Sequence, residues 1–267
     1  MLQEAFTRLN YIGDYLVTDN ECTSYQVWLR AFVRPILDEV GWEPKPGESD
    51  EQKTLRARLF TVFGFDARDP EVLAQARKIA DAAIANPDSV DRELATSALS
   101  VAALTGGEEF YDKLMAELRT AKAPEEYYAI LFTLPQFDDP KLLERTLNFA
   151  ISPDVRSQDA LNVINNMMHN PAGQKLAWNF VLDHWDAVQK AGGTFASAEI
   201  VSATGLFCDA RMRDQVKNFY AAHKIEAAER TYRQSVELIN NCIDLKNKQE
   251  PQLASSLGKQ GTTAGGE

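Results

Sequence analysis

Apolar residues recur along almost the whole chain at spacings of three and four, and sustained alternation with a period of two is hard to find. This spacing is typical of amphipathic helices, whose buried stripe returns every 3.6 residues. Residues that start and end helices separate the apolar segments. These boundaries are Asp69-Pro70, Asn86-Pro87-Asp88, Thr105-Gly106-Gly107, Ala123-Pro124, Asp139-Pro140, Ser152-Pro153-Asp154, Asn170-Pro171, Gly192-Gly193 and Cys208-Asp209. The pattern predicts an all-α protein of about a dozen helices.

Two segments show how individual helices are predicted. Residues 24–40 should form a helix that ends at Gly41 and is kinked or divided by Pro35. Its apolar stripe comprises Val27, Leu29, Phe32, Val33, Ile36 and Leu37. A second helix should begin at Asp69-Pro70, an N-cap followed by proline at the first helical position. Its buried face comprises Val72, Leu73, Ala76, Ile79, Ala80, Ala83 and Ile84.

Short helices joined by short turns favour a stack of antiparallel helix pairs, with a repeating unit of roughly 35 to 45 residues. We therefore expect a curved solenoid of the HEAT or armadillo kind over residues 1–245. A compact bundle is permitted by the same periodicity, although a dozen short helices are many for one bundle. Residues 246–267 are polar and rich in Gly, Ser, Thr and Gln, so we expect them to form a flexible tail.

Charge and cysteine content narrow the partners and the compartment. The formal net charge is −11, from 39 acidic and 28 basic residues, which argues against a nucleic-acid partner. No apolar run approaches the about 18 residues that suggest a membrane span. The three cysteines, Cys22, Cys208 and Cys242, are far apart and form no C-x-x-C pair. This usage favours a reducing compartment, so we expect a cytoplasmic location.

The chain contains no recognisable active-site motif. Three histidines, His169, His184 and His223, are too widely spaced for the H-E-x-x-H helix of a zinc hydrolase. No serine lies in a G-x-S-x-G turn, and no glycine-rich phosphate loop is present. The carboxylate pairs each open a predicted helix, where negative charge complements the helix dipole.

Ordered motifs along the chain resemble the C-terminal domain of the aminopeptidase N family, which includes puromycin-sensitive aminopeptidase and the endoplasmic-reticulum aminopeptidases. The resemblance spans about residues 11–245, and the motifs keep the family's order. They are Tyr15-Leu16, Glu21, Tyr25-Gln26-Val27-Trp28, Val155-Arg156-Ser157-Gln158-Asp159-Ala160, Asn170-Pro171-Ala172-Gly173-Gln174-Lys175-Leu176-Ala177-Trp178-Asn179-Phe180, His184-Trp185 and Ala227-Ala228-Glu229-Arg230-Thr231.

This resemblance implies a helical domain that closes over the catalytic cleft of a zinc-dependent aminopeptidase as a substrate chamber and lid. The zinc and the H-E-x-x-H and G-x-M-x-N motifs would belong to a catalytic domain upstream, and the helical domain here would lack its first helix or two. We therefore expect this chain alone to be inactive. Its partners would be the upstream catalytic domain and peptide substrates, and the isolated domain could self-associate. The alternative is a freestanding helical-repeat scaffold that binds another protein.

Three residues of the V-R-x-Q-D motif are candidates for substrate contact under this resemblance. Arg156 is the first, because a guanidinium can hold a peptide carboxylate in a bidentate pair. The structural alternative is an ion pair between Arg156 and Asp159. Gln158 and Asp159 could orient Arg156 or, in the more conservative interpretation, cap a helix that starts near Ser157. Trp178 and Trp185, placed on one helix face, are predicted to pack in the core.

Overall fold

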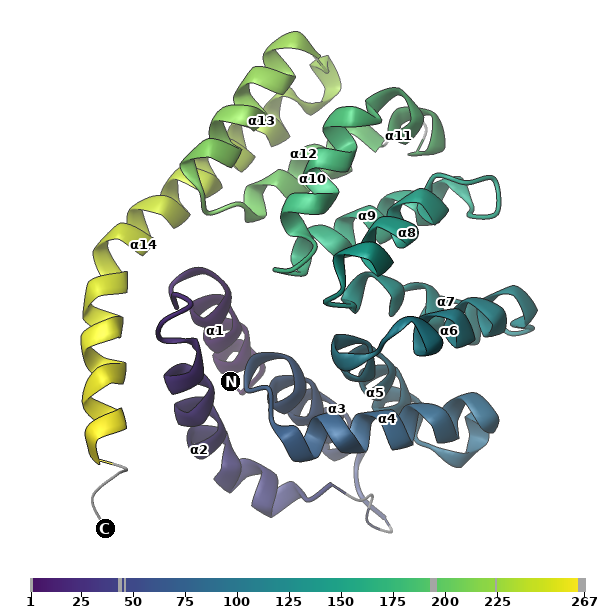
Figure 1. Ribbon diagram of the computed structural model, residues 1–267, viewed down its shortest axis with the longest axis vertical. Helices are drawn as coiled ribbons and strands as arrows, with labels where there is room; N and C mark the ends of the chain where they lie inside the picture. The colour runs from purple at the N-terminus through teal and green to yellow at the C-terminus, as the bar shows by residue number, and fades with distance from the viewer. Residues whose placement is uncertain (1, 43–44, 46, 193–195, 224, 264–267) are drawn as a thin grey trace. The chain divides into compact units, whose positions relative to one another are not determined.

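The computed structural model describes residues 2–42, 45, 47–192, 196–223 and 225–263. Within these ranges the chain is helical and contains no β-strand, which confirms the all-α prediction. Fourteen α-helices are described (Figure 1). They are α1 Leu2–Tyr15, α2 Cys22–Val40, α3 Asp50–Thr61, α4 Pro70–Ala85, α5 Arg92–Thr105, α6 Glu108–Thr120, α7 Pro124–Leu131, α8 Pro140–Ala150, α9 Ser157–His169, α10 Gln174–Asp183, α11 Trp185–Gly192, α12 Ala196–Ala203, α13 Ala210–Ala222 and α14 Glu229–Thr263. A π-helix, η1, spans Val62–Asp66, and short 3₁₀ turns are η2 Pro87–Ser89, η3 Leu134–Gln136, η5 Thr204–Leu206 and η6 Glu226–Ala228.

The chain divides into two compact units. The N-terminal unit comprises residues 1–105 and 248–267, and the central unit comprises residues 106–247. Helix α14 begins in the central unit and ends in the N-terminal unit. The single helical-repeat domain expected over residues 1–245 stays a prediction.

In the N-terminal unit, α5 packs against both α3 and α4. Local sequence fixes where these helices start. Asp69 accepts hydrogen bonds from the backbone N–H groups of Glu71 at 3.0 Å and Val72 at 3.1 Å, as an N-cap should. Ser49 and Gln52 form a reciprocal capping box at the start of α3. The boundary at Asp69-Pro70 is thus confirmed.

Helix α2 departs from the sequence expectation in the width of its apolar face, and Pro35 does not divide it. It runs from Cys22 to Val40 without a break, although Pro35 lies inside it. Leu29, Val33 and Leu37 are buried on one face, and this packing holds the helix across the missing backbone hydrogen bond. Val27 and Phe32 were assigned to the same stripe, but their exposed fractions are 50% and 56%. The apolar face of α2 is therefore narrower than its sequence indicates.

The π-helix η1 follows directly on α3 and packs closely on α5. A Cβ atom added to Gly64 would lie 2.4 Å from Cγ1 of Val101, so the close approach requires glycine. Arg30 of α2 donates from Nη1 to the carbonyl oxygen of Ala67 at 2.7 Å, just beyond the end of η1. A single π-helical turn of this kind often lies at a functional or strained position.

In the central unit, α9 is the helix on which its neighbours assemble. Helices α8, α10, α11 and α12 all pack against it, and Figure 1 shows the helices from α6 to α12 following one another in chain order. Packing between helices close in sequence is typical of a helix-pair solenoid. Within this unit the arrangement fits the predicted repeat architecture. A solenoid over the whole chain stays a prediction.

The two tryptophans predicted to be structural are buried, but not on one helix. Trp178 lies in α10 and Trp185 begins α11, because a break at His184 separates the two helices. Their side chains are 0% and 6% exposed. Both rings meet the ring of Phe219 edge to face, at centroid distances of 5.6 Å and 5.1 Å. The core assignment is confirmed, and the shared helix face was wrong.

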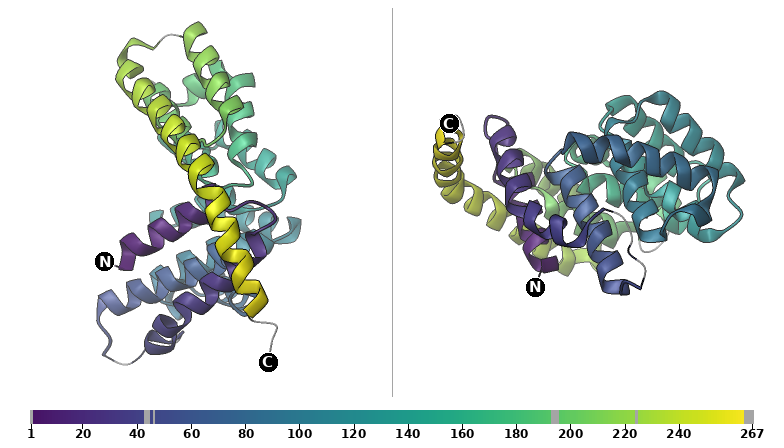
Figure 2. Two further views of the ribbon diagram at one scale, coloured as in Figure 1. Left: turned by 90° about the vertical axis from the view of Figure 1, so that its left-hand side faces the viewer. Right: turned by 90° about the horizontal axis from the view of Figure 1, so that it is seen from below.

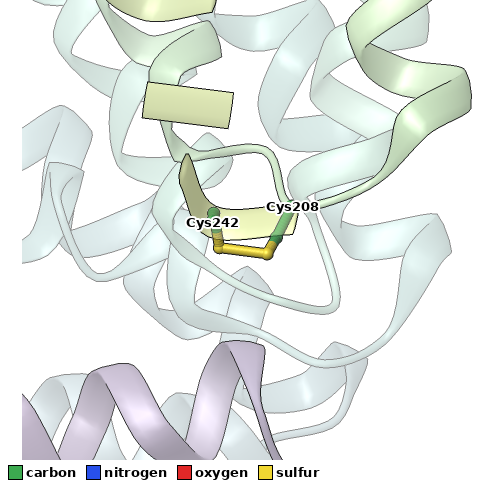
Figure 3. The surroundings of a disulfide bond; sticks show 2 residues. All are labelled: Cys208 and Cys242. Atoms are coloured by element: carbon green, nitrogen blue, oxygen red, sulfur yellow. A yellow bond between two sulfur atoms is a disulfide. The ribbon is translucent and has the colours of Figure 1, made fainter. Parts of the chain in front are cut away.

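Two of the three cysteines form a disulfide bond. Cys208 and Cys242 are 34 residues apart in sequence, and their Cα atoms lie 5.3 Å apart (Figure 3). The bond joins the segment before α13 to the middle of α14, while Cys22 is free and exposed. The cytoplasmic location expected from the cysteine spacing stays a prediction.

Residues 246–263, expected to form a flexible tail, continue α14 as helix to Thr263 (Figure 2). Leu257 is only 4% exposed, so one apolar side chain of this polar segment packs against the fold. Residues 264–267 lie outside the described ranges. In the described part of the chain, no helix combines the length and the apolarity that a membrane crossing requires.

Candidate functional site

The V-R-x-Q-D motif lies at the start of α9 in the central unit. Arg156 is the N-cap residue, with extended backbone angles, and Ser157 is the first residue of the helix. The backbone N–H groups of Asp159 and Ala160 donate to the carbonyl oxygen of Arg156 at 2.8 Å and 3.0 Å. This first turn fixes the direction in which each side chain of the motif leaves the backbone.

The three candidate side chains have different surroundings. Arg156 and Gln158 are exposed, whereas Asp159 is only 2% exposed. The Cζ atom of Arg156 lies 5.9 Å from the ring centroid of Tyr127, which belongs to α7. A guanidinium at this distance is attracted by the negative face of the ring. Arg156 therefore keeps contact with water while Tyr127 limits where its side chain can go.

Asp159 is a buried carboxylate with unused hydrogen-bonding capacity. Its Oδ2 atom is buried and has no hydrogen-bond partner within the described residues. Its position in the first turn of α9 is favourable for negative charge because of the helix dipole. A buried carboxylate oxygen without a donor is costly, so such a group is a good candidate for an interaction completed by a ligand or by another part of the protein.

The charges of Arg156 and Asp159 shift the pKa of Tyr127 in opposite directions. Burial raises the pKa of the Tyr127 hydroxyl, the Asp159 carboxylate raises this pKa further, and the Arg156 guanidinium lowers it. Tyr127 also packs edge to face on Tyr128 at 5.3 Å between ring centroids. The start of α9 and the aromatic face of α7 thus form one site with a positive group outside and a negative group inside.

Two structural alternatives for the motif can now be judged. The predicted capping by Gln158 or Asp159 was wrong, because the start of α9 has no side-chain cap hydrogen bond. Asp159 lies inside the first turn, where its side chain is buried instead of turning back to the backbone. Among the described residues, no ion pair joins Arg156 to Asp159, and the partner of Arg156 is the ring of Tyr127. Arg156 and Asp159 both lie at the start of α9, and their role in substrate contact stays a prediction.

The described residues contain no group of three or more His, Cys, Asp or Glu side chains placed to hold a metal ion. The three histidines serve local structure. Nδ1 of His169 lies 2.8 Å from the carbonyl oxygen of Asn165, and Nδ1 of His223 lies 3.0 Å from that of Phe219. His184 packs on Phe180 at 4.5 Å between ring centroids. We find no set of ligands here to which a zinc ion could be assigned.

Sequence reasoning missed Tyr127. This residue lies about 30 positions before the motif, and nothing in the periodicity marks it for contact with Arg156. The adjacent aromatics Tyr127 and Tyr128 after a helix-starting proline were the only available signal. A contact between α7 and the start of α9 depends on how the helices stack, which local spacing does not specify.

The fold is that of an all-α, helix-stacked domain, with a charged and aromatic site at the start of α9. Sequence comparison makes this class specific, because residues 1–241 match the model of the ERAP1-like C-terminal domain. The chain therefore belongs to the ERAP1-like C-terminal domain family, and the predicted resemblance is confirmed.

Curated relatives agree with this assignment. The chain is 26% identical over 236 residues to "Aminopeptidase 2, mitochondrial" of Saccharomyces cerevisiae, which covers 87% of this chain and 25% of that protein. It is 29% identical over 213 residues to "Aminopeptidase M1" of Arabidopsis thaliana, covering 76% and 23% respectively. A shorter stretch of 105 residues is 33% identical to "Aminopeptidase Ey" of Gallus gallus, covering 38% and 11%. The chain thus spans about a quarter of the length of the first two relatives.

Proposed function

We propose that this chain is the substrate-chamber and lid domain of a zinc-dependent aminopeptidase. The observation that carries the proposal is the family match over residues 1–241, together with relatives whose names are those of aminopeptidases. The catalytic zinc would be held in a separate catalytic domain, because the described residues supply no cluster of metal ligands. In this account the helical chain binds and orients peptides and performs no bond cleavage.

The site at the start of α9 supports a role in contacting substrate. Arg156 offers a planar guanidinium that is exposed and already steered by Tyr127, so little side-chain freedom is lost when it binds a carboxylate. Asp159 lies beneath it with an unpartnered oxygen, ready for a positively charged or hydrogen-donating group. Gln158 is exposed on the same turn and can donate or accept a hydrogen bond. These three residues are our proposed peptide contacts.

The proposal predicts that the isolated chain neither binds zinc nor cleaves peptides. The purified 267-residue chain should contain no stoichiometric zinc and should release no amino acid from aminoacyl-nitroanilide substrates, because general metal catalysis needs at least three protein ligands and an activated water. The full-length protein that contains it should hold one zinc and cleave these substrates. Metal analysis and a chromogenic assay on both proteins measure this.

Either of two results would contradict the proposal. One is tightly bound zinc with chelator-sensitive cleavage by the chain alone, which would place the chemistry here. The other is a full-length protein without zinc or aminopeptidase activity, which would favour a helical scaffold for another protein.

A further inference from the structure

Two adjoining hollows lie on the surface of the N-terminal unit, far in sequence from the α9 site. One, of about 390 Å³, is formed by α3 and α5 with Gln3 of α1 at its edge. The other, of about 540 Å³, is formed by the first turns of α1 and α3. Gln3, Thr54 and Arg58 line both, so the two hollows are continuous at these residues. Each volume suits a small organic ligand.

Arg58 lines both hollows and carries a donor without an acceptor among the described residues. Its Nε atom is buried and has no hydrogen-bond acceptor within the described residues. The Arg58 charge acts on Asp66, whose pKa is raised by burial and lowered in part by this guanidinium. Oδ1 of Asp66 already accepts a hydrogen bond from Nδ2 of Asn10 at 2.8 Å. Arg58 is half-buried, and among the described residues its buried Nε–H has no acceptor, which makes a bound anion favourable there.

The hollow between α3 and α5 adds further groups that suit a carboxylate. Arg92, the first residue of α5, also lines it and brings a second guanidinium. The hydroxyls of Thr54, Thr96 and Ser97 line the same hollow and can complete the hydrogen bonds of an oxyanion. Guanidinium and hydroxyl groups that line one hollow are the donors suited to a carboxylate.

Acidic residues also line the two hollows, and their charge restricts which anions can bind. Glu93 borders the first hollow, and Asp50 and Glu51 border the second. Asp50 is paired with Lys53 at 3.0 Å, which leaves Glu51 and Glu93 as the acidic groups available to a ligand. A dianion such as phosphate would be repelled by these carboxylates, whereas a ligand that also carries an ammonium group would be attracted.

The second hollow also has apolar residues in its lining. Phe6 and Leu55 line it together with Leu2. This combination of guanidinium, carboxylate and apolar surface matches the three parts of an apolar amino acid. We propose that the two hollows bind a small zwitterion of the apolar α-amino-acid class, with its carboxylate at Arg58 and Arg92, its ammonium group toward Glu51 or Glu93, and its side chain on Phe6 and Leu55.

The test measures binding of a set of matched probes to the 267-residue chain. Ligand-observed NMR titration gives the affinity of each probe. The probes are L-leucine, 4-methylpentanoate, which lacks the amine, 3-methylbutylamine, which lacks the carboxylate, and inorganic phosphate. L-leucine should bind saturably, and each of the other three should bind about tenfold more weakly or worse, since each loses a charge-assisted contact.

Variants assign the binding to the hollows. Arg58→Gln should weaken L-leucine binding about tenfold or more, and Arg92→Gln should weaken it to a smaller extent. Arg119→Gln, an exposed arginine of α6 in the central unit, is the matched control and should leave binding unchanged. If circular dichroism shows that Arg58→Gln does not fold, Arg92→Gln and Glu51→Gln carry the same test.

Three results would overturn the proposal. L-leucine could fail to saturate, its binding could be unaffected by every variant that lines the hollows, or phosphate could bind more tightly than L-leucine. The last result would identify a site for simple oxyanions, although Glu51 and Glu93 should disfavour phosphate.

Discussion

The interiors of the two units differ in the kind of side chain that each one buries. The N-terminal unit encloses charge, since Arg56 and Glu48 are paired there with side chains only 3% and 5% exposed. The central unit encloses aromatic rings packed around Trp178. It also contains the Cys208–Cys242 disulfide. Ionic interiors respond to pH, whereas aromatic ones respond to lost volume. We therefore expect pH to act on the N-terminal unit and truncation of a core ring to act most strongly on the central one.

The interior of the N-terminal unit contains carboxyl groups shifted in both directions. The Arg56 guanidinium, hydrogen-bonded to Glu48, lowers the pKa of that carboxyl to about 2. Burial raises the pKa of Asp66 to about 6. Asp14 lies at the surface beside this interior, where desolvation and the nearby Asp66 charge raise its pKa. The same unit thus holds one carboxylate that stabilises when ionised and two that destabilise when ionised.

The largest effect should follow removal of the central aromatic ring. Trp178→Ala should lower the free energy of unfolding by about 3 to 5 kcal/mol, because the ring is fully buried and leaves a cavity against Phe207 and Phe219. Phe32→Ala, which removes an exposed ring of α2, should change it by about 0.5 kcal/mol or less. Denaturant unfolding measures both. Equal losses from the two variants would show that the aromatic core does not dominate the central unit.

Loss of the disulfide should come next. Replacing Cys208 and Cys242 together by serine should destabilise the chain by about 3 to 4 kcal/mol, as expected when a loop of this length is freed in the unfolded state. Cys22→Ser is the matched control, because that thiol is exposed and unpaired, and it should have little effect. Both are compared by thermal and denaturant unfolding without reductant. An unchanged melting temperature in the double variant would show that the bond contributes nothing in solution.

The smallest effect should be the pH dependence of the N-terminal unit. The folded pKa of Asp66, about 6, exceeds its unfolded value of about 3.9, so the folded state binds this proton more tightly. Its stabilising contribution is complete below about pH 4 and is lost as the pH rises through about 6. Asp66→Asn should therefore leave stability unchanged at pH 4 and raise it at pH 8, by about 1 kcal/mol or less because water still reaches the site.

Denaturant unfolding of Asp66→Asn at pH 4 and pH 8 measures this difference, with Asp19→Asn, at an exposed position between α1 and α2, as the control. A gain that is larger at pH 4 than at pH 8 would reverse the sign and contradict the account.

Local signals in the sequence predicted much of the fold but little of the site. The N-cap at Asp69-Pro70 was found because capping depends on neighbouring residues alone. Val27 and Phe32 were misplaced because helical spacing gives the side of a helix but not how much of it is covered. The pairing of Cys208 with Cys242 was missed for a related reason, since contacts across 34 residues depend on helix stacking.

The motif that carries the proposed site was visible, while its surroundings were not. Arg156 and Asp159 were selected through a family resemblance, and the structure places them at one helix start. Tyr127 and the unpartnered oxygen of Asp159 required the packed structure, because burial is a property of the fold. Residue spacing alone therefore could not predict the contacts that surround Arg156 and Asp159.

The most direct test of the central claim, that this chain contacts peptide substrates for a zinc-dependent aminopeptidase, is the dependence of Arg156→Ala on substrate length in the full-length protein. Arg119→Ala, on α6, is the matched control. The account predicts that Arg156→Ala lowers kcat/KM for peptides of several residues by roughly 10- to 100-fold, the value of a lost charge-assisted contact, and leaves single-residue chromogenic substrates unchanged. An equal loss for both substrate classes together with a lower melting temperature, or no loss for either, would contradict it.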